Sequence, residues 1–247
     1  MHTKPLMIEE TNLSRAWITA LEHADAEKSR EITPLILTLT GFDETKEIRN
    51  VLDKALDEDK INSVDTVAET IFPASLYRLC KYDRNAFYNE YIANLPRIHS
   101  IDKRNNRGTY FERLIAFDGN INQLEIIIKS LQSDKSVRRS KLQAAIFDPA
   151  KDHLNGPYQG FPCLQHITFY VTKEGGLVLS SFYAIQLLYK KAYGNWLGLI
   201  NLGKFVAQET GLELERFNCH IGIEQLEISK TKVKGFLSHE CTLVSQE

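Results

Sequence analysis

The sequence lacks the features that mark several common classes of protein. Its four cysteines, at positions 80, 163, 219 and 241, are widely spaced and form no CxxC pair, so neither a disulfide framework nor a zinc site is indicated. No stretch approaches the ~20 apolar residues that span a bilayer. Acidic residues stand near the beginning of the chain, where a signal peptide needs an apolar segment. We therefore expect a cytoplasmic protein that has no metal site and does not associate with membranes.

An excess of charge of one sign is also missing. The 247 residues include 30 basic and 32 acidic side chains, for a formal net charge of -2. Proteins that hold nucleic acid by its phosphates carry a broad basic surface, so a nucleic-acid partner is not favoured. Internal repeats and low-complexity linkers are absent as well. We expect one domain over residues 1–247, long enough to bury a substantial core.

The chain does contain clear local signals for helices and strands. Apolar residues recur at helical spacing in several segments, and the first of these follows Asn12, a good N-cap. Pro73 should end or kink one helix. The segment "TKEGG" joins two strand-like runs and has the composition of a hairpin turn. We predict an α+β domain with a mixed or antiparallel sheet. The expected helices cover 12–29, 43–60, 62–79, 84–95, 120–132 and 194–209, and the expected strands cover 32–42, 140–147, 164–171, 177–188 and 214–228.

Four short motifs occur in a meaningful order in the second half of the chain. They are "NQL" at 122–124, "VRRS" at 137–140, "PC" at 162–163 before "ITFYV", and "GNWLGLINLGKFVAQETGL" at 194–212. Over residues 108–228 this order resembles thymidylate synthase and the related pyrimidine nucleotide hydroxymethylases. The part that precedes residue 108 is divergent.

The resemblance implies a fold, a reaction and a partner. The fold is thymidylate-synthase-like: a large mixed β-sheet flanked by helices, packed against its symmetry mate in a homodimer. In the reaction, a cysteine thiolate adds to C6 of a pyrimidine nucleotide. This addition makes C5 nucleophilic, and C5 then captures a one-carbon unit, methyl or hydroxymethyl, from 5,10-methylenetetrahydrofolate. The expected partners are therefore a second copy of the chain and a pyrimidine nucleotide.

The resemblance also implies roles for individual residues. Cys163 corresponds to the nucleophile, and Asn195 to the asparagine that reads the O4/N3 edge of the pyrimidine. The basic pair corresponds to arginines that reach the nucleotide phosphate across the dimer. A helical glutamate corresponds to the catalytic glutamate, and a tyrosine in "GTYF" to the tyrosine of the family's "YG" segment. These last three roles fall, in this order, on Arg138 with Arg139, on Glu69 and on Tyr110.

Several positions depart from the family pattern. The arginine and serine of the strand after the hairpin become Ala184 and Ile185, and a folate-binding aspartate becomes Leu187. The signature Gly-Gly-Asp-x-His-x-Tyr becomes Gly222 to Glu227. Phosphate, sugar and folate recognition should therefore differ from the family, and a pyrimidine without a 5′-phosphate is one alternative substrate. Arg104, Arg107 or Arg113 is a candidate replacement for the missing arginine.

Each of these residues also has a purely structural interpretation. Free cysteine is usually a small buried residue, so Cys163 could be part of the core, as we expect for the other three cysteines. Asn195 could cap a helix. Glu69 could face solvent, and the arginine pair could be a solvated charge cluster. Glu224 and Glu227 could pair with a ligand, although surface charge at the end of a strand is the ordinary interpretation.

Two functions remain open at this stage. The first is a one-carbon transferase that uses Cys163. The second is a catalytically degenerate relative that binds a nucleotide or assembles with other proteins but has no folate chemistry. A nucleotide that stabilises the protein without turnover would favour the second function.

Overall fold

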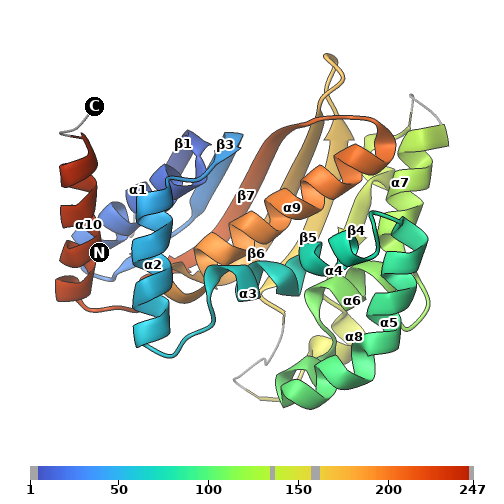
Figure 1. Ribbon diagram of the computed structural model, residues 1–247, viewed down its shortest axis with the longest axis horizontal. Coiled ribbons are helices and arrows are strands. Elements are labelled where there is room, and N and C mark those ends of the chain that lie inside the picture. The colour runs from blue at the N-terminus through green and yellow to red at the C-terminus, as the bar shows by residue number, and fades with distance from the viewer. Residues whose placement is uncertain (1–4, 134–136, 157–161, 245–247) are drawn as a thin grey trace.

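The computed structural model describes residues 5–133, 137–156 and 162–244, except for the side chains of 103–104 and 239–244. Helices α2 to α7 follow one another between the strands of the N-terminal part and those of the C-terminal part (Figure 1). The strands are β1 Leu6–Asn12, β2 Glu31–Ile32, β3 Leu35–Asp43, β4 Gln143–Ala145, β5 Leu164–Val171, β6 Leu177–Leu187 and β7 Leu214–Gln225. The α-helices are α1 Leu13–Ala26, α2 Lys46–Glu58, α3 Val64–Ile71, α4 Ala74–Leu79, α5 Arg84–Ile101, α6 Tyr110–Ile115, α7 Gln123–Ser133, α8 Pro149–Asp152, α9 Tyr193–Thr210 and α10 Lys230–Val244. Shorter turns are η1 Lys103–Arg107, η2 Arg139–Lys141 and the π-turn η3 Leu188–Ala192.

The strands form one mixed sheet of seven strands in the order β1-β3-β7-β6-β5-β4, and β2 also pairs with β7. The pairs β1–β3 and β6–β7 are parallel, whereas β3–β7, β5–β6 and β4–β5 are antiparallel. The predicted hairpin is β5–β6. The mixed sheet flanked by helices confirms the α+β prediction, while the specific fold and the dimer stay predictions.

One face of the sheet is covered by helices, with α9 crossing β5, β6 and β7 (Figure 1). Side chains alternate between the two faces of a strand. In β3, Leu35, Leu37 and Leu39 are fully buried, whereas Ile36 and Thr38 between them are partly exposed. The covered face therefore carries the core, and the opposite face remains accessible along its length.

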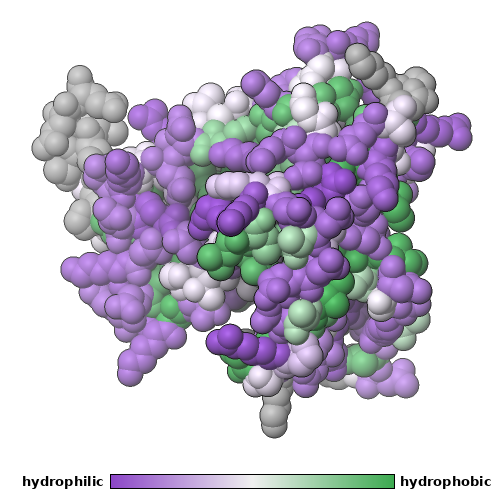
Figure 2. Space-filling model, turned by 45° about the vertical axis from the view of Figure 1, so that its right-hand side comes forward, coloured by the Kyte–Doolittle hydropathy of each residue, from purple (hydrophilic) through white to green (hydrophobic). Residues whose placement is uncertain are grey.

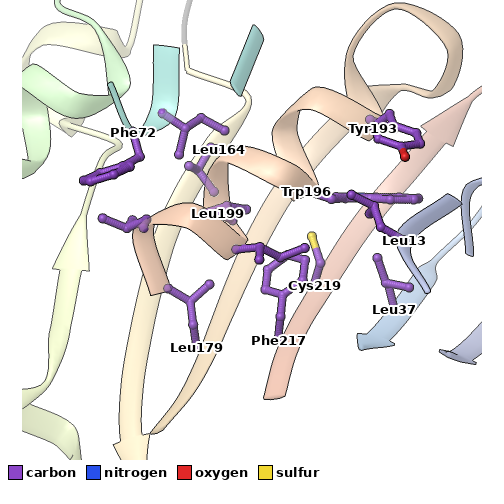
Figure 3. Close-up of a cluster of buried hydrophobic side chains, with 14 of the residues drawn as sticks. Leu13, Leu37, Phe72, Leu164, Leu179, Tyr193, Trp196, Leu199, Phe217 and Cys219 are labelled. Atoms are coloured by element: carbon purple, nitrogen blue, oxygen red, sulfur yellow. The ribbon is translucent and has the colours of Figure 1, made fainter. Parts of the chain in front are cut away.

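The core beneath α9 is built from large apolar side chains. Trp196 and Leu199 of α9 lie close to Phe217 and Cys219 of β7 (Figure 3), and all four are almost completely buried. Trp17 of α1 is also fully buried and donates its indole N–H to the Leu188 carbonyl at 2.9 Å. Cys219 is thus a core residue, as expected, whereas the side chain of Cys241 lies outside the described residues.

Helices α3 and α9 approach closely because α9 has glycines at the contact. A Cβ atom on Gly194 would lie 2.7 Å from the Val64 carbonyl oxygen, and one on Gly198 would lie 2.7 Å from the Ala68 carbonyl oxygen. Only hydrogen fits in these two places. The approach fixes the first turn of α9, which carries Asn195, against the helix that carries Glu69.

Most of the predicted elements are found, with a few differences. Asn12 caps α1 by accepting from Arg15 N at 3.1 Å, and Pro73 separates α3 from α4. The segment 99–111, expected to be a loop, instead contains the end of α5 and the turn η1. Strand β1 and helices α6, α8 and α10 were not predicted. Within the described residues, no helix is both long and apolar enough to cross a membrane.

Candidate functional site

Cys163 stands directly before β5, where its side chain is exposed. Its carbonyl accepts a hydrogen bond from Ala184 N at 3.0 Å, which ties the beginning of β5 to β6. The hydroxyl of Tyr110 lies within hydrogen-bonding reach of the backbone N–H groups of Cys163 and Leu164. Two of the predicted site residues therefore meet, although they are 53 positions apart in the sequence.

The charges around Cys163 act in opposite directions on its thiol. Its crowded surroundings raise the pKa of the thiol above the ordinary value, and the positive charge of Lys191 lowers it by a smaller amount. The net shift is upward, so at neutral pH Cys163 is mainly a thiol. The thiolate is the nucleophilic form of cysteine, and a nearby cation increases its population. Nucleophilic chemistry at this position hence depends on Lys191 and on any further charge that a ligand brings.

Tyr110 is held in place by the local structure of α6. Thr109 caps this helix, and its hydroxyl and Glu112 form a reciprocal capping box. The Thr109 hydroxyl also bonds to Tyr91 Oη at 2.6 Å. These contacts fix the first turn of α6, where Tyr110 is the first residue.

The other end of α6 is fixed by a buried ion pair. Arg113 donates from both terminal nitrogens to the Asp152 carboxylate, at 2.5 and 2.8 Å, and also to the carbonyls of Ile146 and Arg107. Because its guanidinium is used in this way, Arg113 is not available to replace the missing strand arginine. That part of the sequence prediction is wrong for Arg113, while the side chain of Arg104 lies outside the described residues.

Asn195 lies in the first turn of α9, where it is only 6% exposed. The helix begins after Ala192 and has no side-chain cap, because it continues directly from the π-turn η3. The N-capping interpretation of Asn195 is therefore wrong. Lys191, in the π-turn η3, precedes Asn195 by four residues.

Glu69 lies on α3, which packs against both α9 and α6. Its two carboxylate oxygens accept from Ser75, one from the backbone N–H at 3.0 Å and one from the hydroxyl at 2.7 Å. Glu69 also lines a cavity of about 510 Å³ together with Tyr91, Arg97 and Thr109. Glu69 lies in the same group of helices as Tyr110 and Asn195. Its hydrogen bonds among the described residues, however, are to Ser75, six residues later in the chain.

Arg138 and Arg139 are exposed and lie away from Cys163 within the chain. The Arg139 guanidinium stacks over the Tyr170 ring, with 5.5 Å between the guanidinium carbon and the ring centroid. Tyr170 follows Cys163 by seven residues along β5. At about 3.3 Å per residue, this separation is roughly 20 Å. One chain does not bring the pair to its own Cys163.

The structure reveals functional candidates that the sequence analysis missed. Lys191 was not recognised as the cation beside Cys163, because it lies in a π-turn that no periodicity indicates; π-turns occur often at functional sites. Glu224, expected to be a surface charge, is fully buried. Glu227 accepts from the backbone N–H groups of Tyr189 and Lys190 at 3.3 and 2.8 Å, so it fixes η3 rather than facing solvent freely. Among the described residues no cluster of His, Cys, Asp and Glu could hold a metal ion.

Comparison with known proteins gives one distant similarity. No protein-family model matches the chain. The chain is 27% identical over 187 residues to a protein of Methanocaldococcus jannaschii named "Putative thymidylate synthase", a match that covers 73% of this chain and 75% of the other. This similarity agrees with the resemblance carried by residues 108–228, and supports at most a thymidylate-synthase-like family.

Proposed function

We propose that this protein transfers a one-carbon unit to C5 of a pyrimidine nucleotide through a covalent adduct of Cys163 at C6. The observation that carries the proposal is the arrangement at the beginning of β5. There, an exposed cysteine is held by the strand pairing, has its backbone N–H within hydrogen-bonding reach of the Tyr110 hydroxyl and experiences the charge of Lys191. The similarity to a protein named as a thymidylate synthase supports the same reaction class.

Each residue of the site has a defined task in this proposal. Lys191 takes over from the missing strand arginine, which Ala184 replaces, and stabilises the Cys163 thiolate. Asn195, buried and not used as a cap, reads the polar edge of the pyrimidine. Tyr110 fixes the backbone at the nucleophile through the N–H groups of Cys163 and Leu164.

The cavity lined by Glu69 suits the one-carbon donor. Its volume of about 510 Å³ lies within the usual range for small-molecule sites. Pro73, Leu76 and Ile98 give it an apolar wall, and Arg97 supplies a cation that matches the carboxylates of a folate. These residues would hold methylenetetrahydrofolate, which supplies the one-carbon unit when bound. Glu69 in the wall would exchange protons through ordered water.

A homodimer through the uncovered face of the sheet completes the proposal. Cross-strand partners share a face, and one row of them on this face is apolar and aromatic. This apolar row consists of Met7, Ile36, His220, Phe182 and His166. In it, Met7 is 77% and Phe182 37% exposed, and the Phe182 and His220 rings stack at 5.3 Å. On the different surface that Figure 2 shows, hydrophilic residues dominate and hydrophobic side chains form small separate patches.

The proposed dimer would explain the position of Arg138 and Arg139. Arg139 stacks on Tyr170, which alternates with the buried Phe169 and so lies on the uncovered face. In a two-fold pair of sheets, residues at this edge would reach toward the nucleotide phosphate of the other copy. We infer that Arg138 and Arg139 act in this way, because neither reaches Cys163 of its own chain.

The reaction is tested by release of tritium from C5-tritiated pyrimidine nucleotides in the presence of methylenetetrahydrofolate. We expect release by the wild-type protein and none by Cys163→Ala. Mono-, di- and triphosphates and the free nucleosides should all be supplied, since Ala184 removes a phosphate ligand of the family. Thermal stabilisation by a nucleotide without any release would instead favour the nucleotide-binding protein that has lost folate chemistry.

The dimer is tested by light scattering during size-exclusion chromatography. Phe182→Lys places a charge in the centre of the apolar row and should convert a dimer into a monomer. Leu79→Lys is the matched control, because Leu79 is 78% exposed on α4, far from the sheet face in the fold. A wild-type monomer, or a Phe182→Lys dimer, would contradict this interface.

A further inference from the structure

A row of side chains crosses the uncovered face of the sheet near the turn of the β5–β6 hairpin. It runs from Tyr170 on β5 through Val178 on β6 to Arg216 on β7, which are cross-strand partners. Each of them stands next to a residue that points into the core, such as Leu179 and Phe217 (Figure 3). The three side chains therefore lie side by side on the uncovered face, ~4.8 Å apart from strand to strand.

Val178 shows how closely its two neighbours pack against it. It is fully buried, yet it does not belong to the main hydrophobic core. Phe182, four residues further along the same strand and on the same face, is 37% exposed. We attribute the burial of Val178 to the side chains of Tyr170 and Arg216 on either side of it. Arginine stems commonly cover apolar residues in this way, so the charged end of Arg216 has a fixed base.

The row carries two guanidinium groups that meet little opposing charge. Arg139 stacks over the Tyr170 ring at 5.5 Å, and it has no ion pair among the described residues. Arg216 contacts Glu215 at 3.4 Å, but the other oxygen of this carboxylate accepts from the Thr172 hydroxyl. The Nε atom of Arg216 is buried and has no hydrogen-bond partner in the part of the chain that the structure describes. Both arginines thus keep unused donors.

Two guanidinium groups in this arrangement suit a phosphate. A phosphate monoester carries about 1.5–2 negative charges at neutral pH, which two arginines balance. The planar guanidinium fork binds phosphate oxygens through paired hydrogen bonds, whereas a lysine acts only as a point charge. The adjoining row of the sheet consists of Thr168, Ser180 and Asn218. It is polar and uncharged, so it does not repel an anion.

The row also lies at a suitable place for the proposed dimer. Tyr170, Val178 and Arg216 are each four residues from the apolar row, or about 13 Å along the strands. Cys163 is three residues from His166 of the apolar row, about 10 Å in the opposite direction. A two-fold axis along the apolar row reverses the strand direction from one sheet to the other. The arginines of one copy then face the Cys163 end of the second copy, across the ~10 Å between packed sheets.

We propose that Arg216 joins Arg139 in binding the 5′-phosphate of the pyrimidine nucleotide held at Cys163 of the second copy. The inference rests on the proposed function. It assigns to the other chain the phosphate contact that Ala184 has lost, while Lys191 acts on the thiolate within the chain. The substrate is accordingly a pyrimidine nucleoside 5′-phosphate rather than a free nucleoside.

Calorimetric titration tests the phosphate contact without any turnover. The 5′-monophosphates of deoxyuridine and deoxycytidine should bind more tightly than the free nucleosides. Arg216→Met should weaken nucleotide binding about 10-fold or more, the usual effect of losing a hydrogen bond to a charged group, and leave nucleoside binding unchanged. Arg216→Lys keeps the charge and the apolar stem but not the fork, so its affinity should fall between the two.

Arg78→Met is the matched control, because Arg78 is an exposed arginine on α4, away from the sheet face. It should bind nucleotides as the wild type does. Equal nucleotide affinity of Arg216→Met and the wild type would overturn the inference, and so would an equal loss in Arg78→Met.

Mixed dimers test whether the arginine acts across the interface. Arg216→Met and Cys163→Ala are unfolded, combined in equal amounts and refolded together. Each mixed dimer then contains one site with an intact Cys163 of one copy and an intact Arg216 of the other. At low nucleotide concentration, tritium release should rise to about a quarter of the wild-type rate, well above that of either variant alone. No gain on mixing would overturn the inference.

The inference and the proposed function fail separately. Tritium release by the wild type that Arg216→Met does not slow at low nucleotide concentration would overturn the inference alone. No release by the wild type, together with nucleotide binding that depends on Arg216 and not on Arg78, would refute the proposed function but support the phosphate contact.

Discussion

The buried acid predicts a specific dependence of stability on pH. Glu224 is fully buried, and its pKa is raised in the folded protein, whereas in the unfolded chain a glutamate titrates near ~4.3. Above that value the folded state still binds the proton and the unfolded state does not. The stabilisation from this group is therefore complete below about pH 4 and is lost as the pH rises toward the folded pKa.

The magnitude follows from the linkage of one proton. The free energy of unfolding should fall by about 1.4 kcal/mol for each pH unit through which Glu224 stays protonated only in the folded state. For a domain of this size, each kcal/mol of stability lost lowers Tm by about 2–4 °C.

Glu224→Gln isolates this contribution because glutamine is neutral at every pH and similar in shape. Urea unfolding of both proteins across the pH range should show the variant gaining stability relative to the wild type as the pH rises. Other titrating groups, such as Asp59 and Asp118, whose pKa values are lowered by Lys232 and Lys151, cancel in this difference. A difference that does not change with pH would mean that Glu224 is ionised in the folded protein, and the reasoning would fail.

Three other substitutions test further parts of the structure. Lys191→Met should slow the alkylation of Cys163 by iodoacetamide at neutral pH, and Lys191→Arg should largely restore the rate; equal rates in all three proteins would exclude Lys191 as the activating cation. Arg113→Met leaves a buried aspartate without its bidentate partner and should cost about 3–5 kcal/mol in urea unfolding. Gly198→Ala forces a Cβ against the backbone of α3 and should cost about 1–3 kcal/mol, whereas Gly235→Ala, which meets open space in α10, should be neutral or stabilising.

The parts of the fold that the sequence predicted are those determined by local chemistry. Asn12 caps α1 because its side chain bonds to a backbone N–H three residues later. The β5–β6 hairpin follows from the glycines at its turn, where Gly175 adopts φ 95°. Strand β1 was missed because it lies at the edge of the sheet, where Ile8 is its one buried residue. Its pairing with β3 is a long-range contact that no local pattern indicates.

The candidate site was predicted only in part, for a related reason. Cys163 and Asn195 were found because the order of motifs resembles a known family, and Tyr110 does lie against the cysteine. Regular alternation along β7 would place Glu224 on the uncovered face of the sheet. Its burial could not be predicted, because the alternation shifts by one position between Ile221 and Glu224.

The end of β6 leads to the cation that acts on Cys163. A Cβ atom on Gly222 would lie 2.8 Å from the Ala184 carbonyl oxygen, so β6 and β7 approach closely at Ala184. Strand β6 then passes directly into the π-turn η3, which carries Lys191. The extra residue per turn in a π-helix changes the direction in which side chains project. Lys191, seven residues after Ala184, lies in this turn, and its charge lowers the pKa of the Cys163 thiol against the effect of burial.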